Sequence, residues 1–368
     1  MKLHELFDMD LFYEMRQAGF VKAQRHPTFP DVLVILNYTA KAQQNYHWND
    51  VTEQCRGLIY NPMTLDVVAL PFRKFYNYNE AQAPTIAGDE EITAFDKMDG
   101  SLGIVYMAPD EVLRVATRGS FTSDQALWAT QWLWDNIGKT WQEAHGNGYE
   151  WRPYMTDMFE IIYPDNRIVV GYGGYEGLVY IGSRSIESGQ FALDEGAWEG
   201  RKAERLYEGK FSGLFNLPDR ANAEGFVVVT DDERRVKVKY DEYVRMHRIV
   251  SHLSEKYVWE YLGGPSPLRA DELARDIPEE HAEWVRDVSN DLFGKYMTHA
   301  MYINEVTQRI AKMTTRKEKA ISIKDEPNWV RASIFANLDK KDYVGIVWKS
   351  IKPTSNDDEE GDVHGEVD

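Results

Sequence analysis

The sequence has one cysteine, Cys55, in 368 residues, and it has no long apolar run. A single thiol cannot form an internal disulfide, and without a second cysteine or a histidine pair at ligand spacing the chain has no pattern for structural zinc. We expect Cys55 to be a buried spacer. No stretch approaches the roughly 18 consecutive apolar residues of a membrane span. The amino-terminal run MKLHELFDMDLF has acidic residues where a signal peptide needs an apolar block, so we expect a cytoplasmic protein.

Positive charge is also scarce, because 42 Lys and Arg residues face 60 Asp and Glu residues and the formal net charge is -18. A general nucleic-acid binder is normally basic, so this balance argues against one. Seven of the carboxylates lie in residues 355–368, which contain no Lys or Arg. We expect a solvated, disordered tail there. The rest of the chain is still acidic, so a site for a polyanion must be a local groove.

Length and hydrophobic periodicity predict two domains. A chain of 368 residues exceeds the usual size of one core, and 43% hydrophobic and 13% aromatic residues are enough for real cores. Short β-rich runs dominate up to residue 242, with a helix at 123–137, and helical apolar spacing follows. We predict an α+β domain of antiparallel β-sheets with flanking helices at 1–242, an all-α domain at 243–352 and an acidic disordered tail at 353–368. The predicted strands are 32–38, 57–60, 67–70, 102–106, 112–117, 158–163, 168–170, 178–181, 226–230 and 236–240, and one predicted helix spans 328–350, directly after Pro327.

The most informative run is Phe95-Asp96-Lys97-Met98-Asp99-Gly100-Ser101. A lysine two residues before an Asp-Gly turn, between two strand-like stretches, can present its amine to a phosphorus atom at the mouth of a sheet. Lysine is a nucleophile only when it is unprotonated, so we expect neighbouring cations or desolvation to lower the pKa of Lys97. Gly100 permits a tight turn and a close approach of the backbone to a ligand. Taken alone, the run also fits an ordinary hairpin turn with an exposed lysine.

Other cations stand where predicted strands begin or end. Arg56 leads into one strand, and Lys74 follows another, so each can deliver positive charge to the edge of a sheet. Arg118 ends a third strand beside a glycine and a hydroxyl residue, which suits contact with ribose or phosphate. Each of these residues could also belong to a solvated strand face or a surface ion pair.

Two carboxylates and two lysines complete the set. Glu160 lies inside the apolar run 158–163, where an unpaired carboxylate is costly and needs a partner such as a ribose hydroxyl or a cation. Glu224 opens a strand. Lys237 and Lys239 alternate with valines, so both lysines lie on one strand face, where their like charges repel unless an anion lies between them. Together these residues favour a phosphate site over a set of unrelated surface charges.

The runs CRG at 55–57, KFYNYNE at 74–80, KMDGSL at 97–102, TRGS at 117–120, SDQAL at 123–127, FEIIYPDNRIV at 159–169, AEGFVVV at 223–229 and VKVK at 236–239 occur in a distinctive order. In that order and spacing, the chain resembles the ATP-dependent RNA ligases of the phage RNA ligase 1 type. This family lies within the covalent nucleotidyltransferases, which include DNA ligases and capping enzymes. The resemblance covers roughly residues 30–250, and the remainder is similar only in being helical.

The resemblance implies a role for each matching residue. Lys97 matches the lysine that attacks the α-phosphorus of ATP and becomes lysyl-AMP. Glu160 matches the carboxylate that holds the ribose and Glu224 one that binds the catalytic metal, with Glu160 a second metal candidate. Lys237 and Lys239 match a pair on the last motif strand, one near the α-phosphate and the lysine nucleophile, the other also used in handling the triphosphate.

The remaining matches concern the nucleotide. Arg56 and Lys74 match cations that bind the β- and γ-phosphates, and Tyr38 falls near a nucleotide-contacting tyrosine. Arg118 stands where the family often has lysine, so a phosphate or ribose contact carries over but its geometry does not.

The implied activity uses ATP as co-substrate and Mg²⁺ or Mn²⁺. AMP passes from lysine to a 5′-phosphate on RNA, and a 3′-hydroxyl then displaces AMP to form a phosphodiester. The implied partner is RNA with such ends, for example nicked tRNA, in the host cytoplasm if the chain is phage-encoded, and no obligate protein partner is implied. A DNA ligase or capping enzyme shares the first step but usually appends a β-barrel. A non-catalytic RNA-binding module would need no nucleophile.

Overall fold

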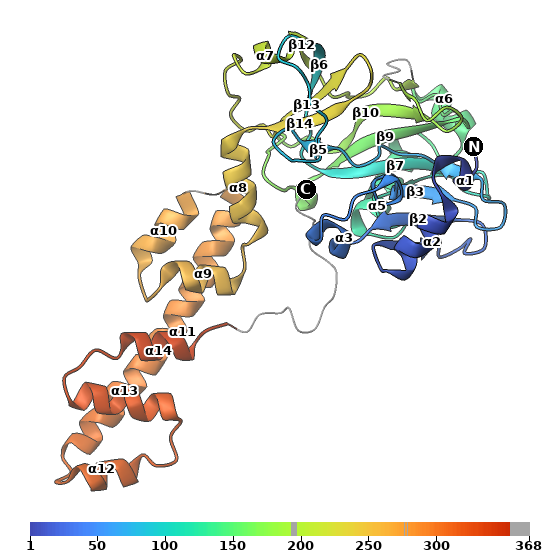
Figure 1. Cartoon of the computed structure of the whole chain (residues 1–368). Helices are drawn as coiled ribbons and strands as arrows, with labels where there is room; N and C mark the ends of the chain where they lie inside the picture. The colour runs from blue at the N-terminus through green and yellow to red at the C-terminus, as the bar shows by residue number, and fades with distance from the viewer. Residues whose placement is uncertain (193–196, 276, 278, 354–368) are drawn as a thin grey trace. The chain divides into compact units, whose positions relative to one another are not determined.

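The computed structural model describes residues 1–192, 197–275, 277 and 279–353, and the predicted acidic tail from residue 354 onward lies outside them. The chain divides into two compact units, Met1–Val244 and Arg245–Asp368 (Figure 1). No helix in the described part is both long and apolar enough to cross a bilayer. The first unit contains three β-sheets with flanking helices, as an α+β domain should.

The first sheet is antiparallel, with strand order β1-β2-β3-β4. All residues of β2 are buried, and alternate side chains face different cores. Leu36 packs with the amino-terminal helix that holds Phe12, whereas Ile35 packs with residues of the second sheet. Cys55 is fully buried in the first of these cores, which confirms its predicted role as a spacer. The elements are α1 (Leu3–Leu6), α2 (Met9–Gln17), β1 (Val21–Arg25), β2 (Val34–Tyr38), α3 (Ala40–Gln44), α4 (Asp50–Gln54), β3 (Arg56–Tyr60) and β4 (Val67–Ala69).

The second sheet is also antiparallel and has the order β11-β10-β9-β7-β8. Strand alternation sends Ile104 and Tyr106 of β7 toward the first sheet, and Val105 toward the helix that contains Leu133. The predicted helix is confirmed as Asp124–Asn136, with the Ser123 side chain capping its amino terminus. The elements are β7 (Ser101–Met107), β8 (Leu113–Ala116), α5 (Asp124–Asn136), α6 (Trp141–Gly146), β9 (Met155–Ile162), η1 (Pro164–Asn166), β10 (Gly177–Ser185) and β11 (Phe191–Ala192).

The third sheet has the order β12-β6-β13-β14-β5. Its pairs are antiparallel except that the short strand β5 runs parallel to β14, a departure from the predicted antiparallel pattern. Ala94, Val228 and Val236 form a core with Phe211 on one face. The elements are β5 (Tyr76–Asn77), β6 (Glu91–Asp96), β12 (Arg205–Lys210), α7 (Phe211–Leu214), β13 (Gly225–Thr230) and β14 (Arg235–Lys239).

The predicted strand at 168–170 is wrong. This segment carries no strand, because the backbone N–H groups of Val169 and Val170 donate to one oxygen of Asp99 at 2.9 and 2.8 Å instead of joining a ladder. The sequence pattern also failed to indicate β1 and β12, whose side chains are largely exposed and lack an apolar run.

The described residues of the second unit contain helices and no strand. The predicted helix at 328–350 begins directly after Pro327 but is interrupted, because Lys340 takes a left-handed backbone conformation with φ of 58°. Two separate cores stabilise the unit, one around Trp348 and one around Ile334. The helices are α8 (Asp241–Ser251), which begins in the first unit, α9 (Glu255–Leu262), α10 (Pro267–Arg275), α11 (Glu279–Ala311), α12 (Arg316–Ser322), α13 (Asn328–Leu338) and α14 (Val344–Ser350).

Candidate active site

Lys97 lies in a short loop that connects two different sheets. The strand before it, β6, belongs to the third sheet, and the strand after it, β7, belongs to the second. The backbone N–H of Lys97 donates to the carbonyl of Gly225 at 3.0 Å, and its side chain is only 18% exposed. The alternative of a hairpin turn with an exposed lysine is therefore wrong, because β6 and β7 do not pair and the lysine faces inward.

Asp99 anchors the loop through hydrogen bonds to both of its carboxylate oxygens. One carboxylate oxygen accepts the two backbone N–H groups of Val169 and Val170, and the other accepts the hydroxyl of Tyr243 at 2.6 Å. Asp99 is almost fully buried, so these donors satisfy a carboxylate that would otherwise be costly. Tyr243 comes from the start of α8, 144 residues further along the chain.

Position 100 has room only for glycine. A Cβ at this position would lie 2.5 Å from the carbonyl oxygen of Ile161 and 3.1 Å from the side chain of Glu160. The backbone N–H of Gly100 donates to Glu160 Oε1 at 3.0 Å. The glycine thus brings the nucleophile loop into direct contact with β9, which carries Glu160.

Glu224 lies between two lysines. Its Oε1 is 2.8 Å from the Nζ of Lys97 and 3.1 Å from the Nζ of Lys239. The carboxylate is 2% exposed, and its other oxygen, Oε2, is buried without a hydrogen-bond partner. The structure thus brings together Lys97, Glu224 and Lys239, which the sequence places on three different strands or loops.

The carboxylates around Lys97 reverse the expected direction of its pKa. Burial acts to lower this pKa, but the charges of Glu224, Glu160 and Asp99 outweigh it and raise the pKa of Lys97 above its ordinary value. The prediction of a lowered pKa is therefore wrong for the ligand-free protein, because the sequence did not reveal how many anions surround the amine. Burial in turn raises the pKa of Glu160 to about 7, against the attraction of Lys97 and with the repulsion of Glu224.

A second cluster surrounds Lys74. Its Nζ lies 4.5 Å from the ring centroid of Trp48, 5.1 Å from that of Tyr76 and 5.5 Å from that of Tyr38. Arg118 donates to the hydroxyl of Tyr38 at 2.5 Å, with its guanidinium carbon 5.0 Å from the centre of the same ring. These aromatic faces hold the ammonium through cation–π contacts.

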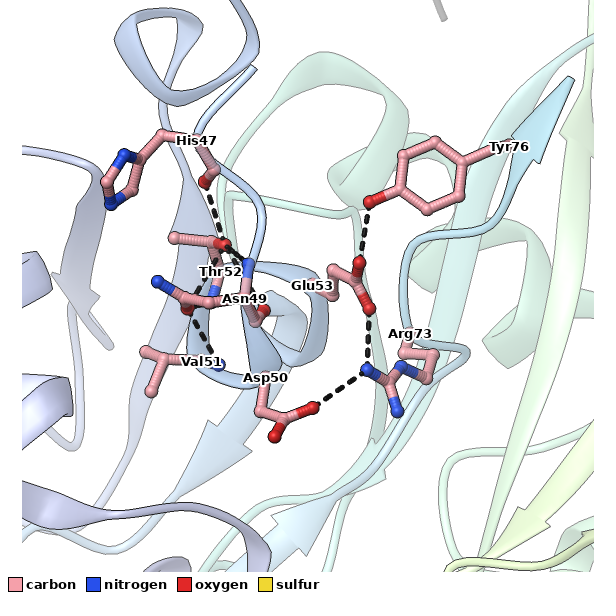
Figure 2. A network of polar contacts seen from close by, with 8 residues as sticks. All are labelled: His47, Asn49, Asp50, Val51, Thr52, Glu53, Arg73 and Tyr76. Atoms are coloured by element: carbon pink, nitrogen blue, oxygen red, sulfur yellow. Dashed lines mark hydrogen bonds and ion pairs between the residues drawn. The ribbon is translucent and has the colours of Figure 1, made fainter. Parts of the chain in front are cut away.

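Figure 2 shows the polar network around Glu53, which joins α4 to Arg73 and to Tyr76 at the start of β5. Glu53 of α4 accepts the hydroxyl of Tyr76 at 2.6 Å and the guanidinium of Arg73 at 2.5 Å. Arg73 also contacts Asp50 at 3.2 Å. The helix itself is held by a capping box in which Asn49 and Thr52 bond reciprocally. The backbone segment with Lys74 is thereby fastened to the helix that precedes Arg56.

Lys237 and Lys239 share a face of β14, as their alternation predicted. The Nζ of Lys237 lies 5.2 Å from the ring centroid of Phe75, and that of Lys239 lies 5.4 Å from that of Tyr243. Lys237 is 5% exposed, so it lies deeper than a solvated strand face would place it. Arg56 begins β3 opposite Asn37 of β2 in the first sheet.

A divalent cation would find few protein ligands here. No group of three or more His, Cys, Asp or Glu side chains suited to a metal occurs among the residues that the structure describes. Glu224 does present a buried oxygen without a partner, and Glu160 is close enough for its charge to raise the pKa of Lys97. Magnesium retains several waters and needs only one or two carboxylates beside substrate phosphates, so these two residues fit such an ion.

Sequence reasoning missed two residues of the site. Trp48 lies before a short helix with no motif around it, and only its aromatic character among polar neighbours could have drawn attention. Tyr243 lay at the predicted start of helical spacing. The sequence could have indicated Tyr243 only indirectly, because a buried Asp99 requires hydrogen-bond donors that the residues next to it in the chain do not supply.

The comparisons with known proteins point to one family. A family model described as RNA ligase matches residues 54–244. A putative bifunctional polynucleotide kinase/RNA ligase of Autographa californica nuclear polyhedrosis virus is 29% identical over an alignment of 239 residues, and the match covers 59% of this chain and 33% of that protein. A putative RNA ligase of Thermovibrio ammonificans is 27% identical over 236 residues, 60% of each chain.

An RNA ligase of Rhodothermus phage RM378 is 24% identical over an alignment of 268 residues, and the match covers 53% of this chain and 60% of that protein. This chain thus matches between 33% and 60% of the length of these three relatives. The family match spans more than half of the sequence and includes Lys97, Glu160, Glu224 and the lysines of β14. The chain belongs to the RNA ligase family, of the phage RNA ligase 1 type, within the covalent nucleotidyltransferases.

Proposed function

We propose that the chain is an ATP-dependent RNA ligase that joins 5′-phosphate and 3′-hydroxyl RNA ends. The observation that carries the proposal is Lys97 itself. The side chain is held in a loop between two sheets, is mostly buried, and is paired with a buried carboxylate at 2.8 Å. Burying an ion pair in the loop between two sheets costs stability, so a structural role does not explain this lysine.

In the first step, the Nζ of Lys97 attacks the α-phosphorus of ATP, forms lysyl-AMP and releases pyrophosphate. The amine must first lose a proton, and the hydrogen-bonded Glu224 is the nearest acceptor. A magnesium or manganese ion at Glu224 and Glu160 would neutralise anionic charge around the amine and on the leaving group when bound. Because the surrounding carboxylates raise the pKa of Lys97, neutralising their charge would favour the unprotonated amine that attacks.

The cations divide by the phosphate that they contact. Lys237 and Lys239 lie along the strand beside Lys97, which suits the α-phosphate. Lys74 and Arg118 share the ring of Tyr38, which suits the β- and γ-phosphates together with Arg56. Preorganised positive charge of this kind stabilises the charge that develops on the leaving pyrophosphate.

The later steps use the same centre. AMP passes from Lys97 to the 5′-phosphate of RNA, and a 3′-hydroxyl then attacks that phosphorus, expels AMP and forms the phosphodiester. We assign nucleotidyl transfer to residues 1–242, which hold every candidate residue that the sequence indicated, and to Tyr243, which follows them and bonds Asp99. RNA selection, for a substrate such as nicked tRNA in the cytoplasm, is assigned to the helical residues 243–352.

The test is incubation with ATP labelled at the α-phosphate, followed by a denaturing gel. The wild-type chain should become labelled, whereas Lys97→Ala and Lys97→Arg should not, because guanidinium stays protonated and cannot attack. Exposed Lys22 supplies a matched control, and Lys22→Ala should label normally. Label on the Lys97 variants would contradict the assignment.

The main alternatives differ in the nucleic acid. A DNA ligase or capping-type enzyme would form the same lysyl-AMP or a guanylate analogue, but the described part of the second unit holds helices where those enzymes usually append a β-barrel. Adding 5′-phosphorylated RNA or DNA to the labelled protein separates the two ligases. A binding module without catalysis would take up no label.

A further inference from the structure

The first unit contains a second basic cavity. Its volume is about 370 Å³, and it is formed by the segment before β5, the turn between β10 and β11, and the turn before β14. Lys97 and Glu224 line a different cavity of about 280 Å³. We call the larger one the arginine pocket, after Arg73, Arg184, Arg234 and Arg235 in its lining.

Two of these arginines are neutralised by carboxylates. Arg73 contacts Glu53 and Asp50, as Figure 2 shows. Arg234 pairs with Asp232 and Glu90. Their positive charge is therefore already balanced within the protein.

Arg235 is different. Its guanidinium carbon lies 3.3 Å from the ring centroid of Phe191 and 4.7 Å from that of Phe72. Its Nε and Nη2 atoms are buried and have no hydrogen-bond partner. Buried donors without acceptors are costly, particularly on a charged group. An anion in the cavity would supply the missing acceptors.

Arg184 adds a second charge beside it. Its Nε and Nη1 donate to the carbonyls of Gly189 and Pro71, both at 2.8 Å, and these neutral groups leave its charge in place. Burial and the neighbouring Arg73 lower the pKa of Arg184 to about 10. Burial also lowers the pKa of Arg235 to about 9, although Glu233 opposes it, and Arg184 adds to the lowering. The surroundings of both side chains therefore disfavour positive charge.

We propose that the arginine pocket binds a backbone phosphate of the single-stranded RNA substrate, with the adjoining nucleotide against its phenylalanine rings. The guanidinium fork of Arg235 matches phosphate oxygens, which accept two hydrogen bonds at once. Phe72, Phe75 and Phe191 line the same cavity, and basic side chains interleaved with aromatic rings are typical of grooves for single strands. Lys74 also lines the pocket, so a strand bound there lies beside the proposed triphosphate cluster.

This inference rests on the proposed function and names where its RNA is held. Free pyrophosphate offers the same phosphate chemistry. The rings favour RNA, because pyrophosphate has no apolar part to place against them.

The test compares Arg235→Gln with wild type in binding of 5′-phosphorylated single-stranded RNA, measured by fluorescence anisotropy without ATP over a series of salt concentrations. Affinity should fall roughly tenfold, and the slope of log affinity against log salt should decrease by about 1. Arg114→Gln is the matched control, because its guanidinium carbon also lies near two rings, those of Phe29 and Trp134, but is paired with Asp110. This control should bind RNA as wild type does.

The midpoint temperature of thermal unfolding of Arg235→Gln should equal or exceed that of wild type, because the substitution removes an unpaired buried charge. If this variant fails to fold, Arg184→Gln tests the same pocket and should weaken RNA binding similarly. The pyrophosphate arm measures the pyrophosphate concentration that removes the label from the adenylylated enzyme as ATP, and Arg235→Gln should leave this concentration unchanged.

Unchanged RNA affinity and salt slope in both arginine variants would overturn the inference, as would a weakened response to pyrophosphate alone. If wild type binds RNA through the pocket but forms no lysyl-AMP, the proposed function fails while the pocket stands. If wild type forms lysyl-AMP and the variants bind RNA normally, only the pocket assignment fails.

Discussion

Glu160 should make the stability of the first unit depend on pH. Burial raises its pKa to about 7 from the ordinary value of 4.5, and Lys97 only partly offsets this effect. The folded protein therefore binds this proton more tightly than the unfolded chain. The stabilisation that comes from this tighter proton binding by Glu160 is fully present below pH 4.5 and is lost as the pH rises through about 7. The separation of the two pKa values corresponds to about 3 kcal/mol.

The perturbation is Glu160→Gln, whose amide oxygen can still accept the N–H of Gly100 but cannot titrate. Relative to this variant, wild type should lose about 3 kcal/mol of unfolding free energy between pH 4.5 and pH 8. Hydrogen exchange of peptides from β9, measured across a urea series at each pH, reports the first unit separately from the second. Taking the difference between the two proteins removes the titration of all other groups.

The control is Glu208→Gln, which alters an exposed carboxylate paired with Arg205 and should show no such pH dependence. A free-energy difference between wild type and Glu160→Gln that stays constant over this pH range would refute the reasoning. It would mean that the charges of Lys97 and its neighbours stabilise the ionised carboxylate more than burial penalises it.

Three further predictions concern the nucleotide site. Arg56→Ala and Lys74→Ala should abolish labelling by ATP yet retain sealing of pre-adenylylated RNA, because their proposed contacts are to the leaving pyrophosphate; equal loss of both activities would contradict this division. Trp48→Ala should raise the KM for ATP roughly fivefold in the labelling assay, because a cation–π contact of about 1 kcal/mol to Lys74 is lost. Tyr243→Phe should cost about 1–3 kcal/mol in thermal unfolding and slow labelling without changing the KM for ATP, because Asp99 loses a buried donor.

Local patterns in the sequence predicted the parts of the fold that depend on local chemistry. The alternation of valines and lysines in β14 indicated which side chains face together, and the Asp-Gly turn indicated the nucleophile loop. The predicted helix at 123–137 was confirmed as Asp124–Asn136, where the Ser123 side chain caps the amino terminus. Each of these depends on residues that are near one another in the chain.

The missed features depend on residues that are far apart. The donors to Asp99 come from Val169, Val170 and Tyr243, at least 70 residues away, and no local pattern connects them. The pKa of Lys97 rises because of the charges of Glu224, which directly precedes β13, and of Glu160, which lies in β9. The strand prediction at 168–170 failed for the same reason, since a distant carboxylate took the backbone donors that a ladder would have used.

The position of α8 leads to a prediction about the minimal adenylating fragment. The boundary between the two units falls between Val244 and Arg245 in the chain, inside this helix, and Tyr243 lies before it. A fragment of residues 1–251 keeps the whole helix and the hydroxyl that bonds Asp99, whereas a fragment of residues 1–239 loses both. We expect the longer fragment to form lysyl-AMP and the shorter one to fail, although both contain Lys97, Glu160, Glu224, Lys237 and Lys239.

The longer fragment exposes Met246 and Ile249, which pack against the core of the second unit in the full chain, so both should be changed to serine to keep it soluble. The measurement is labelling by α-labelled ATP, with circular dichroism to confirm folding. Tyr243→Phe in the longer fragment is the control that separates the hydroxyl from the rest of the helix, and it should label more slowly. A folded, soluble 1–251 fragment that took up no label would show that adenylylation needs residues beyond α8, and the assignment of nucleotidyl transfer to the first unit alone would be wrong.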